Sequence, residues 1–219
     1  MNKRGWRLTA MLFVALVRPA AADTVDDVIA GNRHTMDGVK DFTAVMYVKV
    51  NSDQVRVPES RAKVLFKAPD KFRAQPMDGD FAVMPRTWHS AVGNVLARLA
   101  EHCTVTLLRR ETLGDRDYYV LKAVPKDDND PIARHLLWVD TERYYVGVLR
   151  SYPREGPPAT VRLGYVKHDQ AWLVETATLE ITIKARDDDG KSKTETLSAD
   201  VRFEDYHVNV GLTDDQFKD

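Results

Sequence analysis

The chain contains a single cysteine, Cys103, among its 219 residues. A lone cysteine cannot form an internal disulfide, so the fold cannot depend on a disulfide framework. Cys103 also lies far from the N-terminus, where a lipid anchor on a newly cleaved chain would need a cysteine. We therefore expect a fold that is held together by its hydrophobic core and a protein without a covalent lipid tether.

Recognisable catalytic and cofactor motifs are missing as well. The six histidines form no H-E-x-x-H pair, and no G-x-S-x-G elbow or glycine-rich phosphate loop is present. The acidic run 187–190 ends in glycine, but it lacks the D-x-D-x-D-G spacing and the distal glutamate of a calcium-binding EF-hand loop. We expect no catalytic residues, no metal site, no cofactor and no enzymatic activity, with a hydrolase as the less favoured alternative.

Long apolar runs are scarce. The run at residues 8–17 is about ten residues long, whereas a helix that spans a bilayer needs about 20. We therefore expect no stable membrane span. Lys3, Arg4 and Arg7 precede this run, and residues 20–22 that follow it are all alanine.

This order of basic residues, apolar run and alanines predicts a signal peptide over residues 1–22, cleaved near Ala22. A short buried helix is the alternative interpretation of the same run. Cleavage would remove four basic residues and no acidic one, which changes the formal charge from −1 to −5. A mildly acidic mature protein argues against nucleic-acid binding and against a polybasic membrane anchor. We expect the mature protein to be periplasmic.

Alternation of apolar and polar residues dominates the rest of the chain. A period of two residues is typical of strands, and about nine to eleven such segments are present. Their connections are too short for parallel crossovers, so we expect a mainly β fold with an antiparallel sheet. No serine- or glycine-rich linker interrupts the pattern, which favours a single domain over residues 23–219. The expected strands cover residues 42–50, 61–67, 72–74, 81–84, 104–111, 118–124, 134–139, 144–152, 160–167, 172–185 and 195–206.

Two segments have helical spacing instead. Residues 24–36 carry an apolar stripe, and Thr24 with Asp27 three residues later resembles a capping box at the start of a helix. Residues 88–100 show a second apolar stripe and predict a helix between strands. Gly93 weakens that prediction, because glycine costs about 1 kcal/mol relative to alanine inside a helix.

The segment 66–73, Phe-Lys-Ala-Pro-Asp-Lys-Phe-Arg, joins two of these strands through a Pro-Asp turn. It resembles the K-x-P-D-K-F-R strand pair of bacterial outer-membrane lipoprotein carriers of the LolA-like family. Four further segments resemble motifs of that family in the same order: Val-Lys-Asp-Phe-Thr-Ala at 39–44, Tyr-Tyr-Val-Leu-Lys-Ala-Val-Pro at 118–125, Leu-Trp-Val-Asp at 137–140, and Phe-Glu-Asp-Tyr-His-Val-Asn at 203–209 followed by Phe217. The segment 84–98 departs from the family, which more commonly has a short tyrosine-containing strand there.

The resemblance implies a fold and a function. The family fold is an unclosed antiparallel β-barrel, a curved sheet with about two helices covering its mouth. The family function implies a periplasmic carrier that binds acyl chains of lipoproteins or other lipids and transfers them toward the outer membrane. Its partners would be inner- and outer-membrane transfer components, and the carrier would be a monomer. The alternative is a periplasmic regulatory module that senses lipoproteins or lipids with the same fold.

The candidate lipid-binding residues are the inward positions of the early strands and of the helical lid. For each of them, ordinary core packing is the alternative role. A shift of one residue in strand register would turn every side chain to the other face of the sheet. The candidates are Phe42, Met46, Val48, Val64, Phe66, Phe72, Phe81, Met84, Leu96 and Leu99.

Overall fold

The computed structural model describes residues 23–51, 58–77, 93–186 and 192–218. Most of these residues lie in strands. The elements in chain order are α1 (Val25–His34), β1 (Asp41–Asn51), β2 (Ser60–Lys67), β3 (Lys71–Pro76), α2 (Val95–His102), β4 (Cys103–Leu113), β5 (Arg116–Pro125), β6 (Ile132–Asp140), β7 (Val146–Pro153), β8 (Ala159–His168), β9 (Ala171–Arg186), β10 (Ser192–Val208) and a short 3-10 helix, η2 (Asp214–Phe217).

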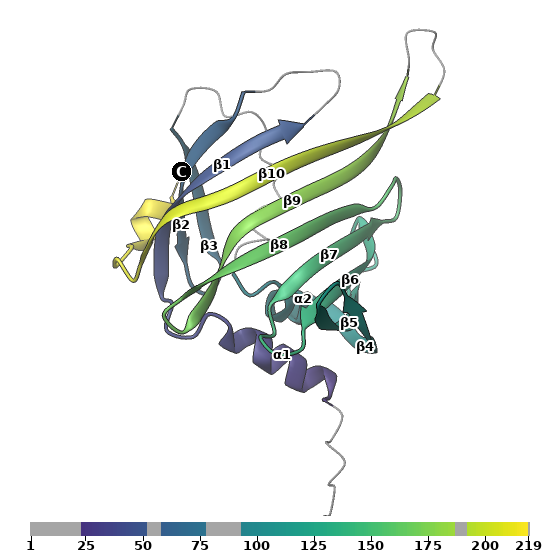
Figure 1. Cartoon of the computed structure of the whole chain (residues 1–219), viewed down its shortest axis with the longest axis horizontal. Coiled ribbons are helices and arrows are strands. Elements are labelled where there is room, and N and C mark those ends of the chain that lie inside the picture. Colours follow the sequence, from purple (N-terminus) through teal and green to yellow (C-terminus); the bar gives the residue numbers. More distant parts are fainter. Residues whose placement is uncertain (1–22, 52–57, 78–92, 187–191, 219) are drawn as a thin grey trace, which may run out of the picture.

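Within the described ranges, ten strands form one antiparallel sheet in the order β3-β2-β1-β10-β9-β8-β7-β6-β5-β4 (Figure 1). The strands β1 to β3 form one meander and β4 to β10 form another. Pairing of β1 with β10 joins the two meanders, and Phe42 lies opposite Val208 in that pair. The two edges of the sheet, β3 and β4, do not pair with each other, so the barrel stays open. The predicted fold class is confirmed.

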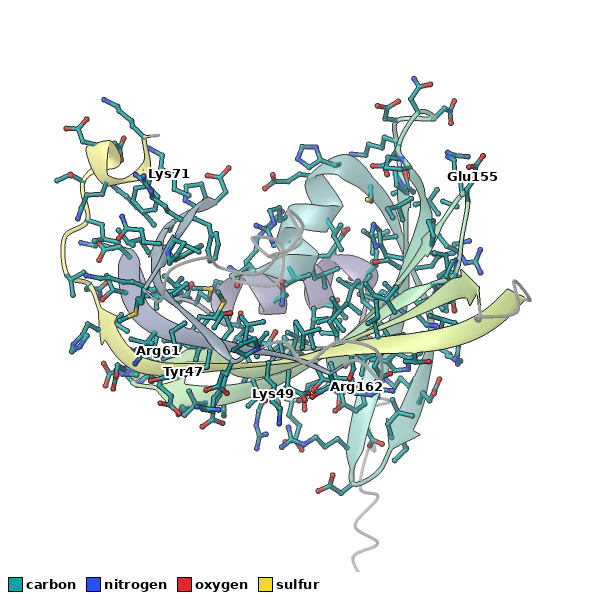
Figure 2. The ribbon with its side chains drawn as sticks, turned by 90° about the horizontal axis from the view of Figure 1, so that it is seen from above. Tyr47, Lys49, Arg61, Lys71, Glu155 and Arg162 are labelled. Carbon is teal, nitrogen blue, oxygen red and sulfur yellow. The ribbon has the colours of Figure 1, made fainter. Side chains whose placement is uncertain are left out.

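The sheet curves strongly, and α1 and α2 lie on its concave side (Figure 2). Register shifts occur between Thr43 and Val45 in β1, between Leu107 and Arg109 in β4, and beside Gly164 in β8. Such bulges bend a strand and increase its twist, which helps a wide sheet to curl. The helices then cover the apolar face that the curvature encloses.

Strand periodicity decides which side chains face the helices. In β1 the buried positions are Phe42, Ala44, Met46 and Val48, every second residue of the strand. Lys49 lies on the convex side, together with other labelled charged side chains of the sheet (Figure 2). The concave face is therefore apolar and the convex face is polar, as the alternation in the sequence indicates.

The first helix begins as the sequence predicts. The backbone N–H of Asp27 donates to Thr24 Oγ1 at 3.2 Å, and the backbone N–H of Thr24 donates to Asp27 Oδ2 at 2.8 Å. These two bonds form a reciprocal capping box, which satisfies donors that a helix start leaves unpaired. The acidic side chain in the first turn also interacts favourably with the helix dipole.

The second helix begins later than the sequence predicts. It starts at Val95, because Gly93 has a φ of +91°, which is outside the helical region. The prediction of a helix over 88–100 was therefore wrong at its start for Gly93 and Asn94. Residues 88–92 and the predicted strand at 81–84 lie outside the described residues.

The strand predicted at 144–152 also begins later, at Val146. Tyr144 has a φ of +59° and belongs to the turn between β6 and β7. Its alternation with apolar neighbours resembles a strand, but a left-handed backbone cannot continue a β ladder. The hairpin turn predicted at 113–116 is confirmed, because β4 ends at Leu113 and β5 begins at Arg116.

Candidate functional site

The concave face of the sheet is lined by aromatic and aliphatic side chains. Phe42 stacks on Phe66 with ring centroids 4.9 Å apart, and its edge meets Tyr206 at 5.1 Å. Pairs in these geometries contribute about 0.5–1.5 kcal/mol beyond their buried area. Met46 and Val64 beside them are fully buried. The result is a continuous apolar wall opposite the two helices.

The structure brings most of the predicted lipid-binding residues together at this wall and on the helix α2 that faces it. Eight of the ten lie in the described part of the chain and belong to one hydrophobic cluster or pack against it. The buried ones are Phe42, Met46, Val48, Val64, Phe66 and Leu96, and the half-buried ones are Phe72 and Leu99. Phe81 and Met84 lie outside the described residues. A role in lipid contact stays a prediction for all ten.

Side chains from later strands complete the wall, and the candidate list omitted them. A small cavity of about 10 Å³ lies between the sheet and the residues Met36 and Gly93, which flank the two helices. Tyr165, Trp172, Leu173 and Tyr206 line it together with Met36 and other residues. Their strands showed the required alternation in the sequence. The pairing of β10 with β1, which the sequence does not reveal, places their strands next to the early strands in the same sheet.

Two tyrosine hydroxyls at the wall donate to backbone carbonyls. Tyr165 donates to the carbonyl of Val146 at 3.1 Å, and Tyr206 donates to the carbonyl of Val174 at 2.5 Å. Burial raises the pKa of Tyr165 and of Tyr206 well above the ordinary tyrosine value, because the interior disfavours a phenolate. The two side chains are therefore neutral, and their polar ends are already occupied by backbone.

A small polar network joins the two helices to each other and to the sheet. Asn32, which is 2% exposed, donates to the carbonyl of Tyr144 at 2.8 Å and accepts from the backbone N–H of Ala97 at 3.1 Å. Thr35 donates to Asn94 Oδ1 at 2.9 Å. Asn32 thus caps the start of α2 from a neighbouring helix. We call Asn32, Thr35 and Asn94 the helix latch.

A close contact also holds α1 against the turn between β6 and β7. A β-carbon added at Gly31 would lie 2.4 Å from the ring of Tyr144. Only glycine lets the ring approach the helix backbone this closely, and this close packing explains the glycine at position 31 of the helix. Tyr144 also stacks over Tyr119 with ring centroids 6.3 Å apart.

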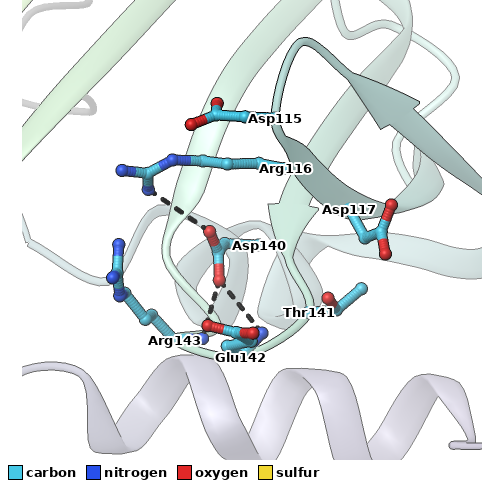
Figure 3. A pocket seen from close by; sticks show the side chains of 7 residues that line it. All are labelled: Asp115, Arg116, Asp117, Asp140, Thr141, Glu142 and Arg143. Carbon is cyan, nitrogen blue, oxygen red and sulfur yellow. Dashed lines mark hydrogen bonds and ion pairs between the residues drawn. The ribbon is translucent and has the colours of Figure 1, made fainter.

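A polar pocket of about 250 Å³ lies at the same turn (Figure 3). Asp140 is buried there and accepts from the backbone N–H groups of Glu142 at 3.0 Å and Arg143 at 2.8 Å. Arg116 contacts Asp140 at 3.5 Å and donates to the hydroxyl of Tyr145. These contacts shape the turn that supports α1, and we assign this pocket a structural role.

A second pocket, of about 340 Å³, lies where α1, α2 and the turn between β2 and β3 meet. We call it the side pocket. Its inner part is apolar and includes Met36, Val39 and Phe66. Its outer part is charged and includes Arg33, Asp70, Arg98, Glu101 and His102.

Other chemistry is not apparent in the described residues. No group of three or more histidine, cysteine, aspartate or glutamate side chains among them is placed to hold a metal ion. Burial is the main cause that raises the pKa of Cys103, which keeps this thiol protonated rather than nucleophilic. None of the helices in the described ranges has both the length and the apolarity that a membrane crossing requires.

An open, strongly curved antiparallel sheet with helices over its apolar concave face defines a class of unclosed β-barrels. Solved structures of this class match the chain over most of its length. A LolA superfamily protein from Nitrosomonas europaea has a TM-score of 0.60 at 16% identity, covering 90% of this chain and 99% of that chain. An outer membrane lipoprotein-sorting protein domain from Vibrio parahaemolyticus has a TM-score of 0.63 at 15% identity, covering 88% and 95%.

A DUF1329 family protein from Desulfovibrio piger matches equally well, with a TM-score of 0.60 at 15% identity over 90% of this chain and 98% of that chain. No protein-family model matches the sequence, and a search of curated proteins finds no match. At these identities the likeness lies in the fold. The resemblance to LolA-like proteins that the sequence motifs indicate is confirmed at that level.

Proposed function

We propose that the mature protein binds acyl chains of lipoproteins or other lipids between the concave face and the two helices. In this proposal it carries them through the periplasm toward the outer membrane, as a monomer that membrane components load and unload. The observation that supports it is a large apolar wall on the concave face of an open sheet, covered by two helices that contribute Val28, Val95 and Leu96 to the same cluster. Burial of an acyl chain contributes about 0.8 kcal/mol per CH₂, so a single long chain offsets much of the cost of leaving a membrane.

The nature of the cover favours exchange of a ligand. The described hydrogen bonds between the two helices and their flanking residues are those of the helix latch. Each such bond contributes only about 0.5–1.5 kcal/mol net. A cavity of about 10 Å³ is lined by side chains of the wall and by Met36 and Gly93, which flank the two helices. An acyl chain is larger than this cavity, so in this proposal the side chains around it rearrange when the chain binds.

The direct test is purification of the exported protein, extraction with organic solvent and mass spectrometry of the extract. We expect acylated molecules in the extract at up to one per protein. Binding of a fluorescent fatty acid then measures affinity. A folded protein that yields no acylated species and binds no fatty acid contradicts the proposal.

Neighbouring residues of β1 offer a matched pair of variants for the same assay. Val48 faces the apolar wall, whereas Lys49 lies on the convex side (Figure 2). Val48→Phe fills space at the wall and should weaken fatty-acid binding several-fold, while Lys49→Phe should leave it unchanged. Thermal unfolding of both variants shows whether each retains the fold, since an extra-large core side chain costs about 1–3 kcal/mol. Equal binding by both variants contradicts the placement of the site at the concave face.

A further inference from the structure

The side pocket and the small inner cavity are separated by very little. Met36 lines both of them. Phe66 lines the side pocket, and the ring of Phe66 stacks on Phe42 at the inner cavity. Methionine is unbranched and has three rotatable bonds, so its side chain adapts easily to a neighbouring ligand. A rotation of Met36 is a small change compared with displacement of a whole helix.

Gly93 adds room at the same place. Its φ of +91° turns the backbone away from helical geometry just before α2. A β-carbon there would lie 3.3 Å from the ring of Phe66 and 3.9 Å from Met36 Sδ. Glycine at this position therefore keeps the backbone close to both side chains without filling the space between them.

The side pocket itself changes from apolar to charged along its depth. The apolar part comes from the segment after α1, from β2 and from α2, and its side chains are buried or half-buried, such as Met36 and Phe66. Met36 connects it to the inner cavity. At the rim, Arg33 and Arg98 supply two positive charges, and Asp70 and Glu101 supply two negative ones. The charges of these two arginines and two carboxylates cancel. A volume of about 340 Å³ is at the small end of the range for ligand sites.

Arg98 is one of the two positive charges at the rim of the side pocket. It is half-buried, and burial is the main cause that lowers its pKa, while the negative charges of Asp70 and Glu101 oppose that effect. Because two carboxylates balance its positive charge, the Arg98 guanidinium should bind a further anion only weakly. The rim instead offers donors and acceptors at short range, which suits a polar group that carries both or has no net charge.

From this arrangement we infer that the side pocket is the entrance for one acyl chain and the seat of its polar end. The chain passes between Met36 and Phe66 to the concave face, and a polar group without net charge stays at the rim. This inference rests on the proposed function and specifies its ligand. Such a polar group occurs in a zwitterionic lysolipid and in the uncharged amide backbone of an acylated peptide.

The first test blocks the entrance. Ala68 lines the side pocket and is exposed, so Ala68→Trp narrows it from the rim without entering the core. The control is Thr106→Trp, at an exposed position of β4 on the other face of the strand from Val105 and Leu107. The probes are lysophosphatidylcholine and a palmitoylated peptide amide of neutral sequence. We expect Ala68→Trp to weaken binding of at least one probe about tenfold, or about 1.4 kcal/mol.

The probe that loses affinity identifies the source of the polar group. Unchanged binding by Ala68→Trp, or equal weakening by Thr106→Trp, overturns the inference and leaves the carrier proposal intact. If the wild-type protein binds neither probe nor a fluorescent fatty acid, the carrier proposal itself fails. Thermal unfolding of each variant confirms that it is folded before binding is measured.

The second test shifts the charge balance. Asp70→Asn leaves the rim with a net positive charge, so the preference for anionic lysophosphatidylglycerol over lysophosphatidylcholine should rise about fivefold. Glu155→Gln is the matched control, because Glu155 is exposed and lies across the molecule from Lys71, the neighbour of Asp70 (Figure 2). No change in preference in Asp70→Asn, or an equal change in Glu155→Gln, shows that the polar end does not lie at this rim.

Discussion

Single side chains explain why the cover sits where it does. Asn32 satisfies backbone groups of two other segments with one amide, which is why a polar residue is retained in the buried face of α1. Gly31 next to it makes room for the ring of Tyr144. The two neighbouring residues therefore bind the same turn in different ways, one by hydrogen bonding and one by close packing.

We expect Gly31→Ala to destabilise the protein, although helix propensity alone predicts that alanine stabilises a helix. Alanine is better than glycine inside a helix by about 1 kcal/mol. Here its β-carbon would lie 2.4 Å from the Tyr144 ring, so the ring or the helix must shift, at a cost of about 1–3 kcal/mol. We expect chemical denaturation to show a net loss of stability. Ala30→Gly on the exposed side of the same helix measures propensity alone, and a stabilised Gly31→Ala protein would show that the close packing has no cost.

Asp214 gives a pH-dependent contact at the end of the chain. It accepts from Lys67 Nζ and Lys71 Nζ, both at 2.7 Å. The hydrogen bonds from these two lysines are the main cause that lowers the pKa of Asp214 to about 2. Because the folded-state pKa lies below the unfolded value of about 4, the contact stabilises the fold above pH 4 and is lost as the pH falls toward 2.

The measurement is the melting temperature of wild-type protein and Asp214→Asn from pH 2 to pH 7. The wild type should melt at the higher temperature at neutral pH, and the difference should vanish near pH 2. Asp128→Asn removes the same charge from an exposed loop and should show no such dependence. A difference between wild type and Asp214→Asn that persists at pH 2 contradicts the ionic origin of the contact.

The helices and strands contribute unequally to stability. Each strand of the sheet pairs with one or two neighbours over most of its length, whereas α2 is attached through a few polar contacts and one apolar side. Elements with few buried contacts open at lower free energy than the core of a sheet. The cover is therefore the part of the described structure that we expect to move first.

Asn32→Ala tests the helix latch. It leaves the carbonyl of Tyr144 and the N–H of Ala97 without the amide partner, which costs about 1–3 kcal/mol for each buried group that stays unpaired. Hydrogen exchange should become faster in α2 than in β9. Asn129→Ala, on an exposed loop, should leave both rates unchanged. If α2 exchanges no faster in Asn32→Ala, the latch does not hold the cover.

The entire protein is arranged around its open edges. A closed barrel of ten strands would leave no lateral path to its interior, whereas here the edge strands β3 and β4 are unpaired with each other. Helix α2, one of the two helices of the cover, directly precedes the edge strand β4 in the chain (Figure 1). The position of this helix is thus tied to one edge of the opening.

The predicted signal peptide can be tested separately from lipid binding. We expect the periplasmic form to begin at Asp23, after removal of residues 1–22. N-terminal sequencing or intact mass measurement of protein from a periplasmic extract checks this. Asp23 accepts from Arg110 at 3.0 Å and from the hydroxyl of Tyr119, so the expected new N-terminus is held against the sheet. Recovery of the full-length chain in the periplasm contradicts the predicted cleavage.

Much of this organisation follows from local patterns in the sequence. Alternation of apolar residues predicts the strands and their buried faces, and Thr24 with Asp27 predicts the start of α1. Two errors have local causes that spacing does not reveal. Gly93 and Tyr144 both adopt positive φ, so a helix and a strand begin later than the apolar periodicity indicates. Apolar periodicity indicates which side chains face the core. It does not fix the backbone conformation at the ends of an element, because that conformation also depends on tertiary packing.

The long-range contacts could not be read in this way. The strand segments, their antiparallel arrangement and the apolar composition of one face are local properties, because each depends on neighbours within a few residues. The pairing of β1 with β10, the approach of Tyr144 to Gly31 and the side pocket between α1, α2 and the β2–β3 turn join residues far apart in the chain. Their positions depend on how the sheet curves and where its edges stop. Tertiary packing therefore settles where the entrance and the latch lie, whereas the residue pattern already required an apolar wall that something must cover.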